Sequence, residues 1–496
     1  MESTRSSTAT PGLQARLLVL AALAILAFQV AGFHSLRHDD AFITFRYGQN
    51  LANGNGLVFN PGERSMASTA PAHALLSAAG YALVGKQRLP SVMSALGCLG
   101  WLAQAAAVFF MLRRALGDRG AGFAALGIAF GAAWSHRFVA LETNLVMACV
   151  LWAIVAALAS RWLAVAALVA LAGLLRPDAY LVALPLGAAC VWNLRAAAWR
   201  PAALGLALSA PWYLFAAAWF GSLLPNSLAN KVGTVALLDQ AYRIANYLGT
   251  NFFTRTISLE IEESLRIASH PPGLVAGATW LLAAAGAVGL IRRQRALWLP
   301  ALCLLLYLVA YLMFRMEIGF EWHLYPALLF VTIFALSALA LAAESLPAGR
   351  GWSIAGSLLL VTIASGFLLR TAHYAQVHER GFWFGARDAA YREVADYLFV
   401  RARPGDVVAA NEVGTIAYYA EAPMLDLLGL VTPLPEEVAE RLGPRLRWVI
   451  DLPAYSGRPR PDAVLLAESE SIHTDELHPP GRDRFSAAVL VWNAQP

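Results

Sequence analysis

Long apolar stretches separated by short polar or basic turns dominate the first three quarters of the chain. A helix needs about 20 apolar residues to cross the hydrocarbon core of a bilayer, and several of these stretches approach that length. The pattern therefore predicts a polytopic α-helical membrane protein. Twelve candidate runs are found, at residues 13–33, 71–85, 91–112, 120–135, 143–160, 162–175, 179–193, 201–220, 274–291, 296–314, 322–343 and 352–370.

Arginine in the short loops predicts how these helices are oriented. Positive side chains concentrate on the cytoplasmic side, which places the N-terminus and the basic cluster at 292–295 inside. Alternating crossings then put residues 34–70, Glu142, Arg176 and the C-terminal tail outside. To keep 34–70 and Glu142 on one side, one intervening run must not span, and the short run 71–85 is the best candidate for an interfacial or re-entrant segment. We predict eleven spans in a bacterial inner membrane.

Near residue 384 the pattern changes to alternating charged and apolar positions, which is typical of a water-exposed domain. About 110 residues are enough for a separate core. We therefore predict a transmembrane domain over 1–383 and a small extracytoplasmic α/β cap domain over 384–496. Its expected elements are helices at 386–401 and 434–442 and strands at 406–410, 424–428, 463–466 and 487–492.

Composition agrees with a membrane protein and excludes other classes. The chain is 58% hydrophobic and 14% charged, whereas soluble domains carry roughly 25% charged residues. A formal charge of +5 would suggest a nucleic-acid partner in a soluble protein, but here the arginines follow membrane topology and we expect no nucleic acid. The four cysteines lie in apolar runs without a CxxC pair, so neither a zinc site nor a disulfide framework is predicted.

Two adjacent carboxylates, Asp39 and Asp40, follow directly after the first apolar run. Their mutual repulsion favours proton uptake by one of them, which suits a general base. Aspartate is also a good residue for capping the amphipathic helix that follows. Spacing alone does not choose between these roles.

Two segments of the first loop resemble a known family. Residues 39–48 read DDAFITFRYG and residues 56–64 read GLVFNPGER, a pattern similar to GT-C membrane glycosyltransferases related to the mycobacterial terminal arabinofuranosyltransferase. After Arg64 the chain reads SMASTA where the family has a Gly-aromatic-Thr segment, so the resemblance leaves the acceptor open. Further similar segments are 141–143, 175–178, 221–226 with Lys231, 320–326, 411–419 and 425–430.

The resemblance implies a GT-C fold and an inverting transfer of a sugar, best taken as arabinofuranose, from a polyprenyl-phosphate lipid to a cell-envelope glycan or a surface protein. A lipid donor also agrees with the residues, because no GxGxxG turn between strand and helix is present to bind a sugar nucleotide. Asp39 or Asp40 would remove the proton from the acceptor hydroxyl. A second catalytic acid is not needed, because phosphate is a good leaving group once its charge is held.

Arg176, Lys231 and His323 are the candidates for holding the donor phosphate or sugar. Lys231 stands out because it lies in an outer loop, against the usual distribution of positive charge. Arg176, before a proline, could equally extend its charge to the interface from a helix end. His323 could equally be an interfacial polar residue beside a tryptophan.

Three further residues are candidates for acceptor or auxiliary roles: Glu142, Arg46 and Tyr47. Glu142 either orients the acceptor or pairs with Arg137. Together with Asp39 and Asp40 it would suit a divalent metal, but no motif requires one, and we predict no cofactor.

Other functions remain open at this stage. A polyprenyl-phosphate mannosyl-type transferase would share every feature named above. A transporter or flippase of lipid-linked sugar would place ionisable residues at mid-membrane and show internal repeats, whereas the carboxylates here lie at the outer ends of runs. A membrane-anchored glycan-binding protein would not need so many helices.

Overall fold

The computed structural model describes residues 38–131, 138–223, 225, 236–256, 272–315, 321–346 and 356 of the helical part of the chain. Farther along it describes 385–403, 405–410, 412–426, 429, 431, 446–451, 471–473 and 488–491. Predictions that concern the run 13–33, Lys231, most of the run 352–370, or the elements at 434–442 and 463–466 lie outside the described residues.

Helices follow one another through the first part of the chain. Each apolar run that the structure describes is helical, and Pro177, Arg195 and Arg295 begin short 3-10 turns between helices. The elements are α2 (Asp39–Ala52), α3 (Pro71–Leu126), the π-helix η1 (Gly127–Gly131), α4 (Thr143–Leu158), α5 (Trp162–Leu175), η3 (Pro177–Val182), α6 (Ala183–Leu194), η4 (Arg195–Ala198), α7 (Trp199–Phe220), α9 (Leu237–Thr256), α11 (Pro272–Arg293), η5 (Arg295–Leu297), α12 (Trp298–Met313) and α13 (Glu321–Ser345).

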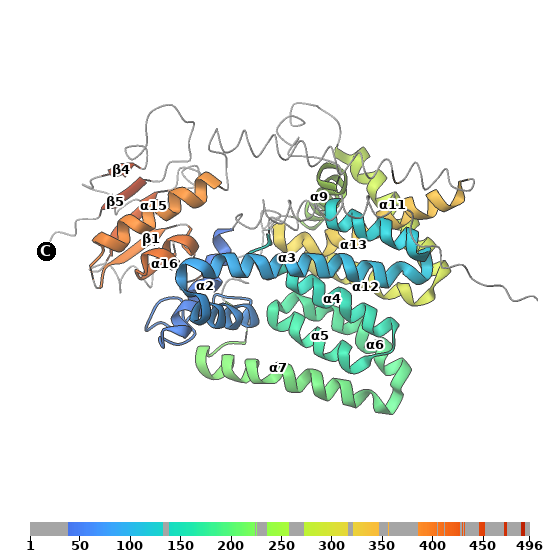
Figure 1. Ribbon diagram of the computed structural model, residues 1–496, viewed down its shortest axis with the longest axis horizontal. Coiled ribbons are helices and arrows are strands. Elements are labelled where there is room, and N and C mark those ends of the chain that lie inside the picture. The colour runs from blue at the N-terminus through green and yellow to red at the C-terminus, as the bar shows by residue number, and fades with distance from the viewer. Residues whose placement is uncertain are drawn as a thin grey trace, which may run out of the picture.

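The helices form layers on both sides of α3 (Figure 1). On one side α4 packs on α3, α5 on α4 and α7 on α5; on the other side α13, α11 and α9 follow in turn. Five helical stretches among the described residues are long and apolar enough to cross a membrane: Pro71–Ala129, Pro177–Phe220, Gly273–Arg293, Arg295–Met313 and Trp322–Ser345. The chain is therefore an integral membrane protein, while the count of eleven spans stays a prediction.

Helix α3 is interrupted at two glycines that adopt left-handed backbone angles, Gly85 (φ 75°) and Gly117 (φ 65°). Glycine takes positive φ without a steric penalty, so both breaks follow from the sequence. The segment from Pro71 to the first break packs against α2. The run 71–85 is thus the first part of α3 and ends at the break at Gly85. That this run does not span the membrane stays a prediction.

Small residues let the helices approach closely. A Cβ atom at Gly97 would lie 1.8 Å from the Val139 carbonyl oxygen, and one at Gly286 would lie 1.9 Å from the Phe334 carbonyl oxygen. Membrane helices gain little from the hydrophobic effect among themselves, and close backbone approach is their main source of packing energy. Cys98, Cys149, Cys190 and Cys303 are free thiols among the described residues.

The last part of the chain, residues 385–491 where described, forms an α/β unit that we call the sheet region. Helix α15 (Gly385–Arg401) leads into β1 (Val407–Ala410), α16 (Gly414–Ala420) and β2 (Met424–Asp426), and three more strands follow, β3 (Leu446–Asp451), β4 (Ser471–His473) and β5 (Ala488–Val491). The strand order is β2-β1-β3-β5-β4. β1 is parallel to β2 and β3, whereas β5 is antiparallel to β3 and β4.

The helix expected at 386–401 and the strands expected near 406, 424 and 487 are present as α15, β1, β2 and β5. Strands β3 and β4 and helix α16 were not predicted. Helix α16 contacts α2, and Figure 1 shows the sheet region beside α2 at one end of the molecule. This contact brings the C-terminal part of the chain to the two aspartates of the first loop.

Candidate active site

Helix α2 begins with the carboxylate pair. Asp39 and Asp40 occupy its first turn, and the residue before them, His38, makes no capping hydrogen bond through its side chain. Negative charge is favourable at a helix N-terminus because the first backbone N–H groups point outward. The capping role considered from sequence thus holds in part: both aspartates lie where their charge stabilises α2.

Asp39 also binds a second helix. Its Oδ1 accepts a hydrogen bond from the N–H of Thr415 at 2.7 Å, and its Oδ2 accepts one from the N–H of Gly414 at 2.9 Å. A Cβ atom at position 414 would lie 2.0 Å from the Asp39 carbonyl oxygen. Only glycine allows the start of α16 to come this close, so the contact is built into both segments.

Asp40 differs from its neighbour. Its side chain is partly exposed, and within the described part of the chain it makes no hydrogen bond or ion pair. The two adjacent carboxylates are therefore not equivalent: one accepts hydrogen bonds from backbone N–H groups of α16, and the other has no such partner among the described residues.

Arg46 and Tyr47, candidates for auxiliary roles, shape the loop after α2. Arg46 donates from Nε to the Phe59 carbonyl oxygen at 3.3 Å, and Tyr47 donates from its hydroxyl to the Ser65 carbonyl oxygen at 2.6 Å. Both side chains are buried. Burial lowers the pKa of Arg46 to about 10, partly offset by Glu421, so its guanidinium stays charged at neutral pH. Both residues bind backbone groups of the loop that follows α2, and their acceptor or auxiliary role stays a prediction.

Arg176 is fully buried at the end of α5. Its Nε and Nη2 donate to the two carboxylate oxygens of Asp178 at 2.7 and 3.0 Å, and its Nη1 donates to Thr143 Oγ1 at 3.3 Å and to the Trp322 carbonyl oxygen at 3.0 Å. The carbonyl of Trp322 is available because the residue four positions later, Pro326, has no N–H. A guanidinium has five N–H groups, so protein acceptors engage four of them.

These contacts bring four separated segments together at one place. The ring of His38 packs edge-on against Trp322 with 4.6 Å between ring centroids, and Trp322 accepts the hydrogen bond from Arg176 described above. His323 follows Trp322 and is buried. The start of α2, the start of α4, the end of α5 and the start of α13 therefore meet.

Glu142 lies at this meeting point. It precedes α4, it is buried, and the next residue, Thr143, contacts Arg176. The charge of Glu142 also stabilises the charged form of Arg176. Pairing with Arg137 cannot be followed, because Arg137 lies outside the described residues. In the described ranges no group of three His, Cys, Asp or Glu side chains is placed to hold a metal ion.

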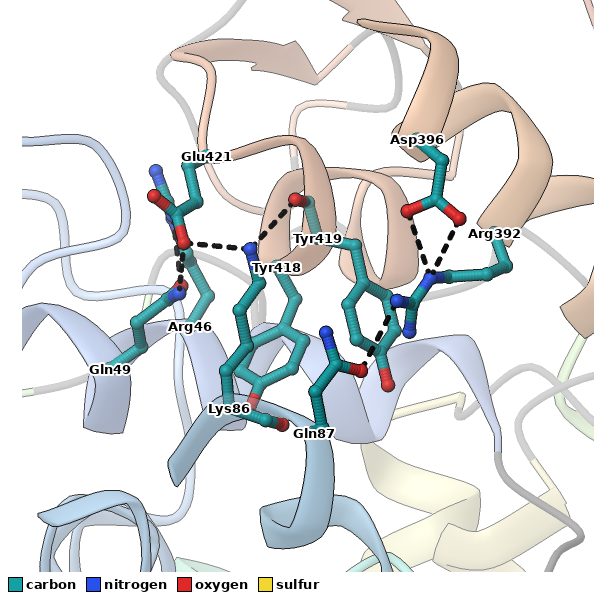
Figure 2. Close-up of polar contacts among 9 residues, drawn as sticks. All are labelled: Arg46, Gln49, Lys86, Gln87, Arg392, Asp396, Tyr418, Tyr419 and Glu421. Carbon is teal, nitrogen blue, oxygen red and sulfur yellow. Dashed lines mark hydrogen bonds and ion pairs between the residues drawn. The ribbon is translucent and has the colours of Figure 1, made fainter. Parts of the chain in front are cut away.

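Sequence reasoning missed the polar contact between α2, α3 and α16 (Figure 2). Lys86 donates to the Tyr419 carbonyl oxygen at 2.9 Å and to Glu421 Oε1 at 2.7 Å, and Gln49 donates to the same Glu421 oxygen at 3.3 Å. One signal was present in the sequence: the polar residues at 86–88 separate the apolar runs 71–85 and 91–112.

Comparisons with known proteins give a family model for one part of the chain and a fold for the whole. A model described as a domain of unknown function (DUF8728) matches residues 376–492, which include the sheet region. No curated protein matches the chain significantly.

Solved structures match nearly the full chain. ArnT from Cupriavidus metallidurans superposes with a TM-score of 0.62 in the apo state, at 14% identity, over 96% of this chain and 98% of that one. Its complex with undecaprenyl phosphate gives a TM-score of 0.58 at 14% identity, over 98% and 99%. The archaeal oligosaccharyltransferase AglB from Archaeoglobus fulgidus, in complex with an inhibitory peptide and a dolichol-phosphate, gives 0.54 at 13% identity, over 89% and 70%. At these identities the likeness establishes the fold, and the chain has the fold of GT-C glycosyltransferases.

Proposed function

We propose that the protein is an inverting glycosyltransferase that takes a sugar, best assigned as arabinofuranose, from a polyprenyl-phosphate lipid and transfers it to a cell-envelope glycan or a surface protein. The reaction takes place on the extracytoplasmic side of a bacterial inner membrane. There, residues 384–496 form a cap domain over the first loop. The two solved relatives described above contain undecaprenyl phosphate and dolichol-phosphate, which supports a lipid donor for this chain.

The chemistry needs one base and a stabilised leaving group. A carboxylate of the pair takes the proton from the acceptor hydroxyl while that oxygen attacks the anomeric carbon from the face opposite the phosphate. The bond between the anomeric carbon and the phosphate oxygen breaks, and the oxygen keeps the electron pair. The products are the glycosylated acceptor, with inverted configuration, and polyprenyl phosphate; the proton then leaves the carboxyl group to solvent.

The observation that carries this proposal is the open carboxylate of Asp40 at the start of α2, beside the meeting point of the other segments, in a chain with the GT-C fold. Within the described part of the chain Asp39 makes the contact with α16 and Asp40 makes none, so Asp40 is the carboxylate that we assign to the acceptor hydroxyl.

The phosphate of the donor needs a cation. Arg176 has most of its N–H groups engaged and its charge matched by Asp178, so its part is to hold the helix ends around the site. Lys231, in the outer loop, is the cation that binds the donor phosphate. His323, at the start of α13, donates a hydrogen bond to the donor. Glu142, next to the contact with Arg176, orients the acceptor.

The test is transfer by membranes that contain the wild-type protein, with decaprenyl-phosphoryl arabinose and polyprenyl-phosphoryl mannose as parallel radiolabelled donors. Asp40→Asn should abolish transfer, because an amide cannot accept the proton; loss of a general base costs about 10²- to 10⁴-fold in rate. Asp118→Asn, which changes an exposed aspartate, is the matched control and should transfer normally.

The choice of donor follows from the same assay. Transfer from the mannose lipid alone would replace arabinofuranose by a mannosyl assignment within the same mechanism. Undiminished transfer by Asp40→Asn would refute Asp40 as the base. Movement of labelled lipid between leaflets without any glycosylated product would replace the transferase by a flippase.

A further inference from the structure

We infer that Asp39 is a positioning residue: its carboxylate fastens α16 of the sheet region to the start of α2, and this docking holds Asp40 in the orientation that removes the acceptor proton. The inference rests on the proposed function and assigns different roles to two neighbouring aspartates. It also makes the sheet region a part of the catalytic apparatus.

The first step concerns Asp39 itself. Each of its oxygens accepts a hydrogen bond from a backbone N–H of α16, at 2.7 and 2.9 Å. The start of α16 also covers the carboxylate, since a Cβ atom at Gly414 would lie 2.9 Å from Oδ2. A base must present an oxygen to the acceptor hydroxyl with its proton about 2.6–3.2 Å away between heavy atoms. Both oxygens of Asp39 are already engaged by α16, whereas Asp40 makes no hydrogen bond within the described part of the chain.

The second step concerns the opposite end of α16, which is also held by hydrogen bonds and an ion pair. The Tyr418 hydroxyl donates to the Lys86 carbonyl oxygen at 2.7 Å. In a regular helix this carbonyl would accept from the N–H four positions later. That residue is Pro90, which has no N–H, so the Tyr418 hydroxyl takes its place. The Lys86 ammonium in turn binds Glu421, directly after α16. Figure 2 shows these side chains converging between α2, α3 and α16.

The third step concerns the loop after α2. The Asn60 side chain forms a pair of hydrogen bonds with the backbone of Met424, donating at 2.8 Å and accepting at 2.9 Å. Ser65 donates to the Val431 carbonyl oxygen at 2.7 Å. The sheet region therefore binds the start of α2 through Asp39 and the loop after α2 through Asn60 and Ser65.

The fourth step concerns α15, which joins the same contact. Arg392 lies over the ring of Tyr419, with 3.6 Å from its guanidinium carbon to the ring centroid, and donates to Gln87 Oε1 at 3.1 Å. Three elements of the sheet region thus hold α2 and the kinked part of α3. Because Asp40 is adjacent to Asp39 at the first turn of α2, any loosening of this contact changes the direction of the Asp40 carboxylate.

A weakened docking contact should therefore affect kcat and the KM for the lipid donor differently. A base that is misdirected by even 1 Å loses much of its effect, whereas donor binding depends on groups elsewhere. Weakening the docking should therefore lower kcat and leave the KM for the lipid donor unchanged. A substitution that weakens the docking without changing any charge should also leave the pH profile of kcat unchanged, because Asp40 is still the base.

The experiment combines hydrogen exchange with kinetics on the full-length protein in nanodiscs. In Asp39→Asn one oxygen becomes an NH₂ group that faces backbone N–H groups, so exchange of the peptide that contains Gly414 and Thr415 should become roughly 10- to 100-fold faster, as for loss of hydrogen bonds to a charged acceptor. kcat should fall by a similar factor, and the KM for the lipid donor should stay unchanged. Asp40→Asn should abolish transfer and leave this exchange unchanged.

A second variant keeps the inference falsifiable without touching Asp39. Asn60→Ala weakens the docking at the other end of the loop and should lower kcat in the same way, with an unchanged donor KM. Asp118→Asn is the control for both readouts.

Three results would overturn the inference. They are normal exchange of α16 together with abolished transfer in Asp39→Asn, normal kcat in Asn60→Ala despite faster exchange, or a changed pH profile in Asn60→Ala. Absence of transfer by the wild-type protein from every lipid donor would refute the proposed function and the role of Asp40 with it. Even then, the exchange measurement would decide whether Asp39 fastens α16.

Discussion

The helix layers around α3 and the contact between α2 and α16 are held together by different kinds of interaction. In the helix layers, glycines bring backbones into direct contact, as at Gly97 and Gly286. In the α2–α16 contact, side chains such as Asp39, Asn60 and Lys86 bind backbone groups across hundreds of positions in the sequence.

This difference indicates which region sets the orientation of the carboxylate pair. Close packing is strong in sum but has little directionality, because each atom pair contributes only about 0.1–0.2 kcal/mol. A hydrogen bond to a charged group is stronger and depends on angle. The helix layers therefore supply a stable frame, whereas the α2–α16 contact fixes the orientation of the carboxylate pair.

The largest effect is expected for breaking the helix frame. In Gly97→Leu the new side chain meets the Val139 carbonyl group, where even a Cβ atom would be 1.8 Å away. The backbones must separate, and we expect a loss of more than about 4 kcal/mol. Size-exclusion profiles of solubilised membranes should show no folded peak.

The matched control is Gly122→Leu, on the same helix, where a Cβ atom would meet nothing within 4 Å. It should give a normal profile. A folded Gly97→Leu protein would show that α3 and the segment before α4 can move apart. The claim that close backbone packing makes the helix layers a stable frame would then be wrong.

A smaller loss is expected at the buried ion pair where the two regions adjoin. Asp178→Ala leaves the Arg176 guanidinium, 1% exposed, without its carboxylate. Removal of one partner of a buried pair costs about 3–5 kcal/mol, so the thermal midpoint should fall clearly. Asp118→Ala removes the partner of Arg113 in an exposed pair and should leave the midpoint unchanged; equal shifts would mean that burial does not matter here.

A still smaller effect is expected in the α2–α16 contact. Asn60→Ala removes both hydrogen bonds to Met424 and leaves a buried N–H and a buried carbonyl without those partners, at a cost of about 1–3 kcal/mol. Limited proteolysis should cut the sheet region faster while the helices stay intact. Asn53→Ala, at an exposed position in the same loop, is the control; equal proteolysis in both would contradict the docking role of Asn60.

The smallest effect is expected for Lys86→Met, which removes the ion pair with Glu421. The Glu421 side chain is 43% exposed, and pairs that are open to solvent contribute about 1 kcal/mol or less. Added salt should abolish the difference in thermal midpoint between this variant and the wild type. A difference that persists at high salt would show that the hydrogen bond to the Tyr419 carbonyl, and not the charge, carries the contribution.

The sequence predicted the kind of residue at the site better than the role of each. Asp39 and Asp40 were found as a pair, because two adjacent carboxylates at the end of an apolar run are conspicuous. Their different roles could not be predicted, since they depend on N–H groups 375 and 376 positions away. Arg46, Tyr47 and Arg176 were found as polar residues near the site, but three of their acceptors, at Phe59, Ser65 and Trp322, are backbone carbonyl groups, which leave no mark in the sequence.

The sequence alone determined that this chain lies in a membrane and that its last part builds helices and strands. These features follow from local hydrophobicity and backbone preference, which each segment carries by itself. Only the tertiary structure decided that α16 reaches back to α2, that Trp322 links the start of α13 to Arg176 and His38, and that one aspartate of the pair is bound and the other open. Such contacts depend on the free energy of packing distant segments together, and no local pattern records that quantity.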